Sequence, residues 1–169
     1  MLALSLSLIL AFGAYGKKQN SGTSSSPVAA PSITPADSPQ DLAKAIGQAY
    51  LESLGKVVDL LKDKPEAASI KPQIVELKEA TVQTLVALGH KKEALGAADR
   101  EVVNAALRLQ LGLTPKDMFS AFSQAQQFYF SKDIELANLI SSFNIITQYA
   151  DFDLLKKQTP AEAQRLGLK

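Results

Sequence analysis

The stretch Ser38–Leu61, SPQDLAKAIGQAYLESLGKVVDLL, decides the fold class of this 169-residue chain. Ser38 is a good N-cap, Pro39 stands at the first helical position, where no N–H is needed, and Asp41 places a carboxylate in the first turn. Apolar side chains then recur in steps of three and four residues, as on one face of an amphipathic helix: Leu42, Ile46, Ala49, Tyr50, Leu54, Val57, Val58 and Leu61. Pro65 ends this helix, because α conformation is disfavoured before a proline.

Helical patterns continue to the end of the chain, without the alternating β-branched runs or Asn-Gly turns that indicate hairpins. We expect further helices at about residues 70–88, 91–111, 115–130, 131–149 and 160–167. Gly89 is placed as the C-terminal glycine of the first of these. The second carries the apolar stripe Leu95, Ala98, Val102, Ala106 and Leu109. The segment 131–149 is apolar around most of its circumference, which predicts a central helix.

Short connections between these segments favour antiparallel neighbours. The sequence therefore predicts an all-α fold, a compact up-and-down helical bundle of about five long helices plus a short C-terminal helix. We expect the folded domain to cover residues 39–169.

The residues before this domain look like an export signal. Leu2–Phe12 is an apolar run, too short to span a bilayer. The small residues Gly13 and Ala14 follow, then Tyr15, Gly16 and two lysines. This segment, 1–16, resembles a bacterial lipoprotein signal, with Tyr15 where that signal has its lipidated cysteine.

The resemblance implies a protein of the bacterial periplasm or outer surface. If position 15 is natively Cys, the protein is anchored to a membrane by its lipid. If Tyr15 is native, lipidation is impossible and cleavage after Gly16 is expected. Residues 17–38 are rich in Ser, Thr, Gly, Ala and Pro, a composition that predicts a disordered tether.

Charge and composition exclude several classes of function. Basic and acidic residues nearly balance, giving a net charge of +1, and both signs are interspersed. Without a basic patch we expect no nucleic-acid partner. The chain has no cysteine, which excludes disulfides, thiolate nucleophiles and thiolate metal sites.

Catalytic motifs are also missing from the sequence. His90 is the single histidine, so a serine nucleophile has no other imidazole base, and no Glu-x-x-His pair exists for a di-iron site. Phosphate-binding loops, nucleophile elbows and dinucleotide fingerprints are absent. We therefore expect no enzyme activity, no cofactor, no catalytic residues and no metal site.

Aromatic residues gather in the last third of the chain, beside the uncharged stretch Met118–Phe130. Two interpretations remain open: these side chains fill the core, or they form a surface for a partner or ligand. The residues of this candidate surface are Phe119, Phe122, Phe128, Tyr129, Phe130, Phe143 and Tyr149.

The leading functional prediction is an exported, envelope-associated helical protein that binds a protein partner, as an accessory or assembly factor of a larger complex. One alternative is a carrier of an apolar small molecule, held between the helices at 115–130 and 131–149. Another is a scaffold: Leu88–Leu95, LGHKKEAL, resembles part of a tetratricopeptide repeat, with a fainter echo at Asp133–Ala137. The spacing between Ala94 and Ala137 is longer than that repeat's period of about 34 residues.

Overall fold

The computed structural model describes residues 38–168, so the expected signal-like segment, Tyr15 and all of the tether except Ser38 lie outside the described residues. Within 38–168 the chain forms seven α-helices and one 3-10 helix, and no strand. The all-α prediction is confirmed. The expected count of five long helices and one short helix is wrong. The expected long helix at 131–149 is a short α-helix followed by the 3-10 helix, and an additional short helix, Phe152–Gln158, precedes the last one.

The first helix, α1 (Pro39–Leu61), begins where the sequence predicts. The Ser38 hydroxyl accepts a hydrogen bond from the Asp41 N–H at 3.2 Å, and the Asp41 carboxylate accepts one from the Ser38 N–H at 3.3 Å. This capping box satisfies two backbone donors at the start of the helix. The buried face of α1 contacts α2, α3, α4 and the 3-10 helix, so the helix forms the centre of the packing.

The second helix, α2 (Ala67–Glu93), runs four residues past Gly89, which therefore does not end it. A Cβ atom at Gly89 would lie 2.5 Å from Cε1 of Phe152 and 3.2 Å from Cα of Ala150. The glycine is explained by this close approach of another segment rather than by a helix end. His90 consequently lies within the helix, with its ring 4.9 Å from that of Phe152.

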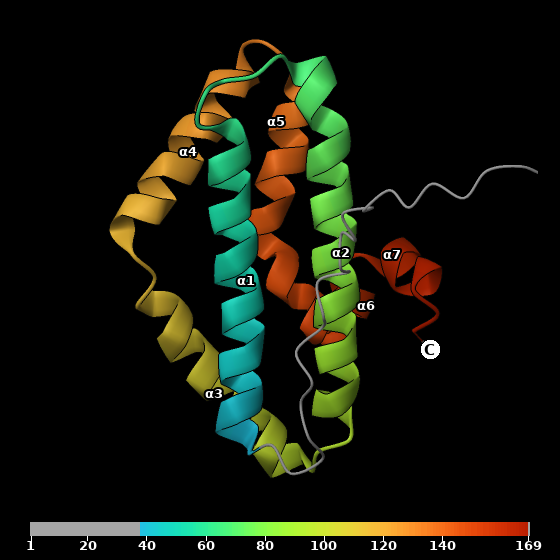
Figure 1. Cartoon of the computed structure of the whole chain (residues 1–169). Coiled ribbons are helices and arrows are strands. Elements are labelled where there is room, and N and C mark those ends of the chain that lie inside the picture. Colours follow the sequence, from blue (N-terminus) through green and yellow to red (C-terminus); the bar gives the residue numbers. More distant parts are fainter. Residues whose placement is uncertain (1–37, 169) are drawn as a thin grey trace, which may run out of the picture. The chain divides into compact units, whose positions relative to one another are not determined.

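Two shorter helices, α3 (Ala97–Gly112) and α4 (Lys116–Phe130), pack one after the other along α1 (Figure 1). Val103 is the one fully buried residue of α3. The apolar stripe expected from the sequence is largely on the outside, since Ala98, Val102 and Leu109 are exposed. The apolar side chains of α3 that pack against the core are Val103, Ala106, Leu107 and Leu111, so Ala106 is the member of the expected stripe within α3 that faces inward.

The expected helix at 131–149 is split into α5 (Ile134–Ser141) and the 3-10 helix η1 (Ser142–Ala150). The Ser141 and Ser142 hydroxyls donate to the carbonyl oxygens of Ala137 and Leu139, at 2.8 and 2.6 Å. Such bonds compete with the α-helical ladder, and the β-branched run that begins at Ile145 has a low helix propensity. Central placement is confirmed, because η1 contacts α1, α2, α5 and α6.

Two short helices close the described chain, α6 (Phe152–Gln158) and α7 (Pro160–Arg165). Helix α7 lies where the sequence predicts a helix at 160–167, whereas α6 lies where no helix was expected. Asp151 starts α6 by accepting the Leu154 N–H at 3.0 Å. In α7, the Glu162 carboxylate accepts hydrogen bonds from the Tyr149 hydroxyl at 3.0 Å and from Arg165 at 2.7 Å, which fastens the helix to η1.

Followed along the chain in Figure 1, the direction alternates: α1 runs up, α2 down, α3 and α4 up, and α5 with η1 down. The up-and-down order is thus kept over four passes along the bundle: α1, α2, α3 with α4, and α5 with η1. The last two passes each consist of two helices. The passes share one core, whose largest fully buried side chains are Phe122, Tyr129, Phe143, Ile46, Leu54, Leu61, Ile74, Leu85, Leu136, Ile140, Ile146 and Leu155. No helix in residues 38–168 is long and apolar enough to cross a membrane.

Candidate binding groove

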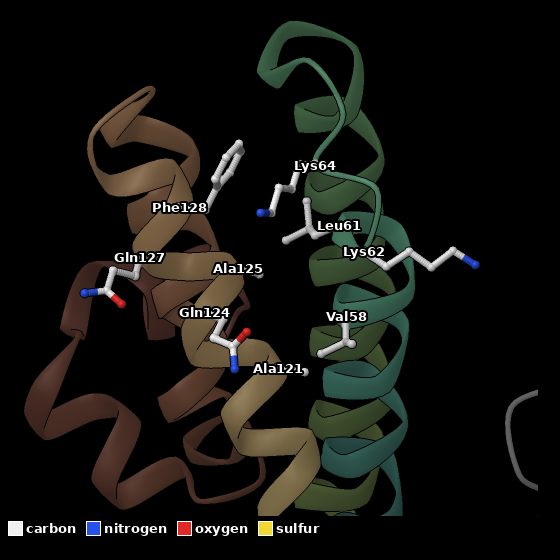
Figure 2. Close-up of a pocket in the computed structure, with 9 residues that line it drawn as sticks. All are labelled: Val58, Leu61, Lys62, Lys64, Ala121, Gln124, Ala125, Gln127 and Phe128. Atoms are coloured by element: carbon white, nitrogen blue, oxygen red, sulfur yellow. The ribbon is translucent and has the colours of Figure 1, made fainter.

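An open groove of about 490 Å³ lies between the C-terminal half of α1 and α4 (Figure 2). Its volume falls within the range of about 300–1,000 Å³ typical of ligand-binding clefts. Both helices and the turn after α1 supply its lining: Val58, Leu61, Lys62, Lys64, Ala121, Gln124, Ala125, Gln127 and Phe128.

The hollow arises from small side chains on α4. Ala121 and Ala125 are one turn apart on the side of α4 that lines the groove, and Val58 and Leu61 line it from α1 (Figure 2). Methyl groups on one side cannot fill the space that larger apolar side chains would occupy. The result is an apolar floor open to solvent.

Phe128 lies at the end of the groove between two lysines. The ammonium nitrogen of Lys132 is 4.3 Å from the centre of its ring, and that of Lys64 is 4.9 Å away. Both distances are within the range of cation–π attraction. Lys62 and Lys64 line the groove and no carboxylate does; the ammonium of Lys64 points toward α4, whereas that of Lys62 points away (Figure 2).

Lys64 is the only non-glycine residue in 38–168 with a positive φ, at 52°. This left-handed conformation is uncommon for a side chain with a Cβ and costs about 1 kcal/mol or more. Here it forms the turn that follows α1, closed by a hydrogen bond from the Lys64 N–H to the Leu61 carbonyl at 2.9 Å. A locally unfavourable backbone is therefore held at the rim of the groove.

Hydrogen bonds fix α4 beside the groove. The Tyr129 hydroxyl donates to the Pro65 carbonyl at 2.6 Å, which ties the end of α4 to the turn between α1 and α2. Burial, reinforced by the negative charge of Glu66, raises the pKa of the Tyr129 phenol. The Gln126 amide donates to the Ser141 hydroxyl at 2.6 Å and fastens α4 to α5. The groove is thus built on a fixed frame.

The structure separates the aromatic residues that the sequence grouped together. Four of them are buried in the core: Phe122, Tyr129, Phe143 and Tyr149. Phe119 is half-buried against the core, and Phe130 is 64% exposed. Phe128 alone among the seven lines the groove.

The uncharged polar residues of α4 indicated the groove better than the aromatic residues did. Gln124 and Gln127 are exposed and line the groove beside Phe128. The α1 side of the groove was missed, since Val58 and Leu61 carried only the signature of a core face. Lys64 carried no signal in sequence, because its conformation is set by the turn that it forms.

A second, smaller pocket of about 230 Å³ has polar walls, formed in part by Lys92, Gln148 and Asp151. The ammonium of Lys92 is 2.8 Å from an Asp151 carboxylate oxygen. Burial opposes ionisation of Asp151, but the hydrogen bonds from Lys92 and from the Leu154 N–H outweigh it and lower the pKa of this carboxyl. The Oε1 atom of Gln148 is buried without a hydrogen-bond partner in the described chain.

In residues 38–168 no group of three or more His, Asp or Glu side chains is placed to hold a metal ion. Comparisons with protein-family models, curated proteins and solved structures find no match for this chain.

Proposed function

We propose that this chain is an exported, envelope-associated protein that acts by binding a protein partner, as a lipoprotein-type accessory or assembly factor of a larger complex. The observation that carries the binding proposal is the α1–α4 groove, with its apolar floor, its uncharged glutamines and Phe128 between two lysines. Desolvated aromatic anchors surrounded by polar groups are typical of the centres of protein interfaces.

The groove also indicates what its partner should look like. An apolar side chain of the partner fills the hollow over Ala121 and Ala125, and a carboxylate beside it meets Lys64. A short partner segment with an apolar anchor next to an acidic residue fits both features. We therefore propose that the ligand is an apolar and acidic protein segment.

The carrier alternative has less support. It requires space for a ligand between α4 and the segment that follows, yet Phe122 and Phe143 are at most 1% exposed and belong to the packed core. The tetratricopeptide alternative is not favoured by any contact described above: Leu88–Leu95 forms the end of α2 and the turn after it.

The binding proposal is tested by capture of partners from envelope extracts of the native source, using the full chain. Ala121→Arg should block the groove, and Phe128→Ala should remove its anchor, so each should lower capture of a specific partner by tenfold or more, on the order of an interface hot spot. Phe130→Ala is the matched control, because Phe130 lies on the same helix, is exposed and does not line the groove. Capture that is equal for the wild type and both groove variants would contradict the proposal.

The proposal that the protein is exported rests on the residues before α1, and it is tested separately. Mass spectrometry of the mature N-terminus from the native source should show a lipid-modified residue 15 if that residue is natively Cys. With Tyr15 it should show a chain that begins at Lys17. An unprocessed chain found in the cytoplasm would contradict the export proposal and would leave the groove proposal standing.

A further inference from the structure

Helix α3 has two apolar faces, and only one of them is covered. Val103, Leu107 and Leu111 face the bundle. A second stripe runs along the outside of the helix and is exposed at every position: Ala98, Val102, Ala105, Leu109 and Leu113. Val102 is 37%, Leu109 73% and Leu113 84% exposed. Contiguous exposed apolar surface of this kind marks an interaction site.

Charged residues flank this outer stripe in a regular pattern. Glu101 directly precedes Val102, and Arg108 directly precedes Leu109. Seven residues separate the two charges, which is nearly two full turns, so both lie on one flank of the stripe. Neither forms an ion pair with another residue of 38–168. That flank of the stripe therefore carries one free negative and one free positive charge, and the exposed Asp99 lies on the other flank.

We propose that the outer stripe of α3 binds a second copy of this chain, with the two α3 helices antiparallel and related by a two-fold axis. In heptad terms Val102 and Leu109 take positions a, and Ala98 and Ala105 take positions d. Antiparallel pairing sets each a residue against a d residue of the other helix. Val102 then meets Ala105 of the second copy, and Leu109 meets its Ala98, so that each larger side chain faces a small one.

The same register places opposite charges next to each other. Glu101 and Arg108 both occupy position g, and in an antiparallel pair the g flanks face each other. Glu101 of one copy therefore lies opposite Arg108 of the other, and the two-fold axis produces this pair twice. An isologous interface must be self-complementary, and a flank whose one negative and one positive charge face each other across the two-fold axis meets that condition. This self-complementarity is why we assign the surface to a second copy rather than to an unrelated protein.

The proposed interface is separate from the groove between α1 and α4, and it goes beyond the proposed function. The paired residues run from Ala98 to Leu109 on α3, so the contact extends over about 17 Å. Such a contact is smaller than a standard stable interface, and we expect a reversible dimer with a dissociation constant on the order of micromolar. A dimer of this kind presents two copies of the groove to a partner.

Sedimentation equilibrium of the full chain over a wide concentration range tests the proposal. The wild type should show a monomer–dimer equilibrium. Leu109→Gln should remove the dimer at every concentration reached, because it replaces the largest apolar side chain that the pairing buries with an amide. Circular dichroism checks that the variant keeps its helix content, and Ile145→Gln serves as the matched control, since Ile145 is exposed on η1 and lies outside the stripe.

Charge reversal tests the register. Glu101→Arg and Arg108→Glu each place like charges opposite each other twice, and each should raise the dissociation constant about tenfold. The double variant exchanges the two signs and should return to within about threefold of the wild type. A chain that is monomeric at all concentrations, or a dimer unaffected by Leu109→Gln, would overturn the proposal. Failure of the double variant to restore the dimer would overturn the antiparallel arrangement.

Discussion

Phe143→Ala should lower the free energy of unfolding by about 3–5 kcal/mol, the usual range for removing a buried phenylalanine ring. Phe143 is fully buried in η1 and belongs to the core cluster shared by the helices. Its removal leaves a cavity that the surrounding helices can fill only in part. Urea denaturation followed by circular dichroism measures the loss.

Two further variants make this result specific. Phe143→Leu keeps most of the apolar volume and should cost less than the alanine variant. Phe130→Ala removes a ring that is 64% exposed and should change stability by no more than about 0.5 kcal/mol. A Phe143→Ala variant as stable as the wild type would contradict the assignment of Phe143 to the core. It would revive the carrier alternative, in which this ring lines a ligand pocket.

Local signals predicted the parts of the fold that local chemistry controls. The start of α1 followed from Ser38, Pro39 and Asp41, whose side chains act on the backbone within one turn. The same logic would have found α6, because Asp151 is a capping residue followed by an acidic first turn and two lysines at the end. The local signal for α6 is therefore present in the sequence.

Contacts between distant segments determined what the sequence could not show. Gly89 has the sequence appearance of a helix end, yet its role depends on Phe152, which lies 63 residues later. Likewise, periodicity places the apolar residues of α3 on a helix but does not say which of two apolar faces meets α1. In residues 131–149 the apolar pattern predicts one continuous helix. It does not show that two serine hydroxyls bond to backbone carbonyls where the α-helix ends.

The candidate groove likewise has one wall that the sequence indicates and one that it does not. Its α4 wall was visible in sequence as an uncharged, glutamine-rich segment with aromatic residues. Its α1 wall was not, because Val58 and Leu61 belong to the same periodic stripe as the residues that fill the core. The hollow forms where Ala121 and Ala125 of α4 face Val58 and Leu61 of α1, and this pairing of two distant helices is set by tertiary packing.

The buried ion pair between Lys92 and Asp151 should be the most sensitive polar contact in the described chain. Lys92 is 5% exposed, and its ammonium is 2.8 Å from the Asp151 carboxylate. Asp151→Ala leaves this ammonium without its counter-charge and also removes the cap of α6. We expect a loss of about 3–4 kcal/mol, near the lower end of the range for breaking buried pairs, because the Asp151 side chain is one-third exposed.

Matched variants separate the two contributions. Asp151→Asn removes the charge but keeps an oxygen that can accept the Leu154 N–H, so it should be about 1 kcal/mol less damaging than the alanine variant. Lys92→Met removes the ammonium and fills its space with an apolar side chain. It should cost less than Asp151→Ala, because the remaining carboxylate is partly solvated and still caps α6. Equal losses for all three variants would show that the pair contributes through packing rather than through charge.

The ion pair also predicts how stability depends on pH. The pKa of Asp151 is lower in the folded chain than its ordinary value, because the hydrogen bonds from Lys92 and from the Leu154 N–H outweigh the opposing effect of burial. A group with a lowered folded-state pKa stabilises the fold above its unfolded pKa, about 3.9 for Asp, and this contribution is lost as the pH falls further through the folded value. The free energy of unfolding, measured from pH 7 to pH 2, should therefore fall less steeply below pH 4 in Asp151→Asn than in the wild type. The difference between the two curves isolates Asp151 from the other carboxylates, which both proteins share. Parallel curves would mean that the carboxylate gains nothing from Lys92 in the folded chain.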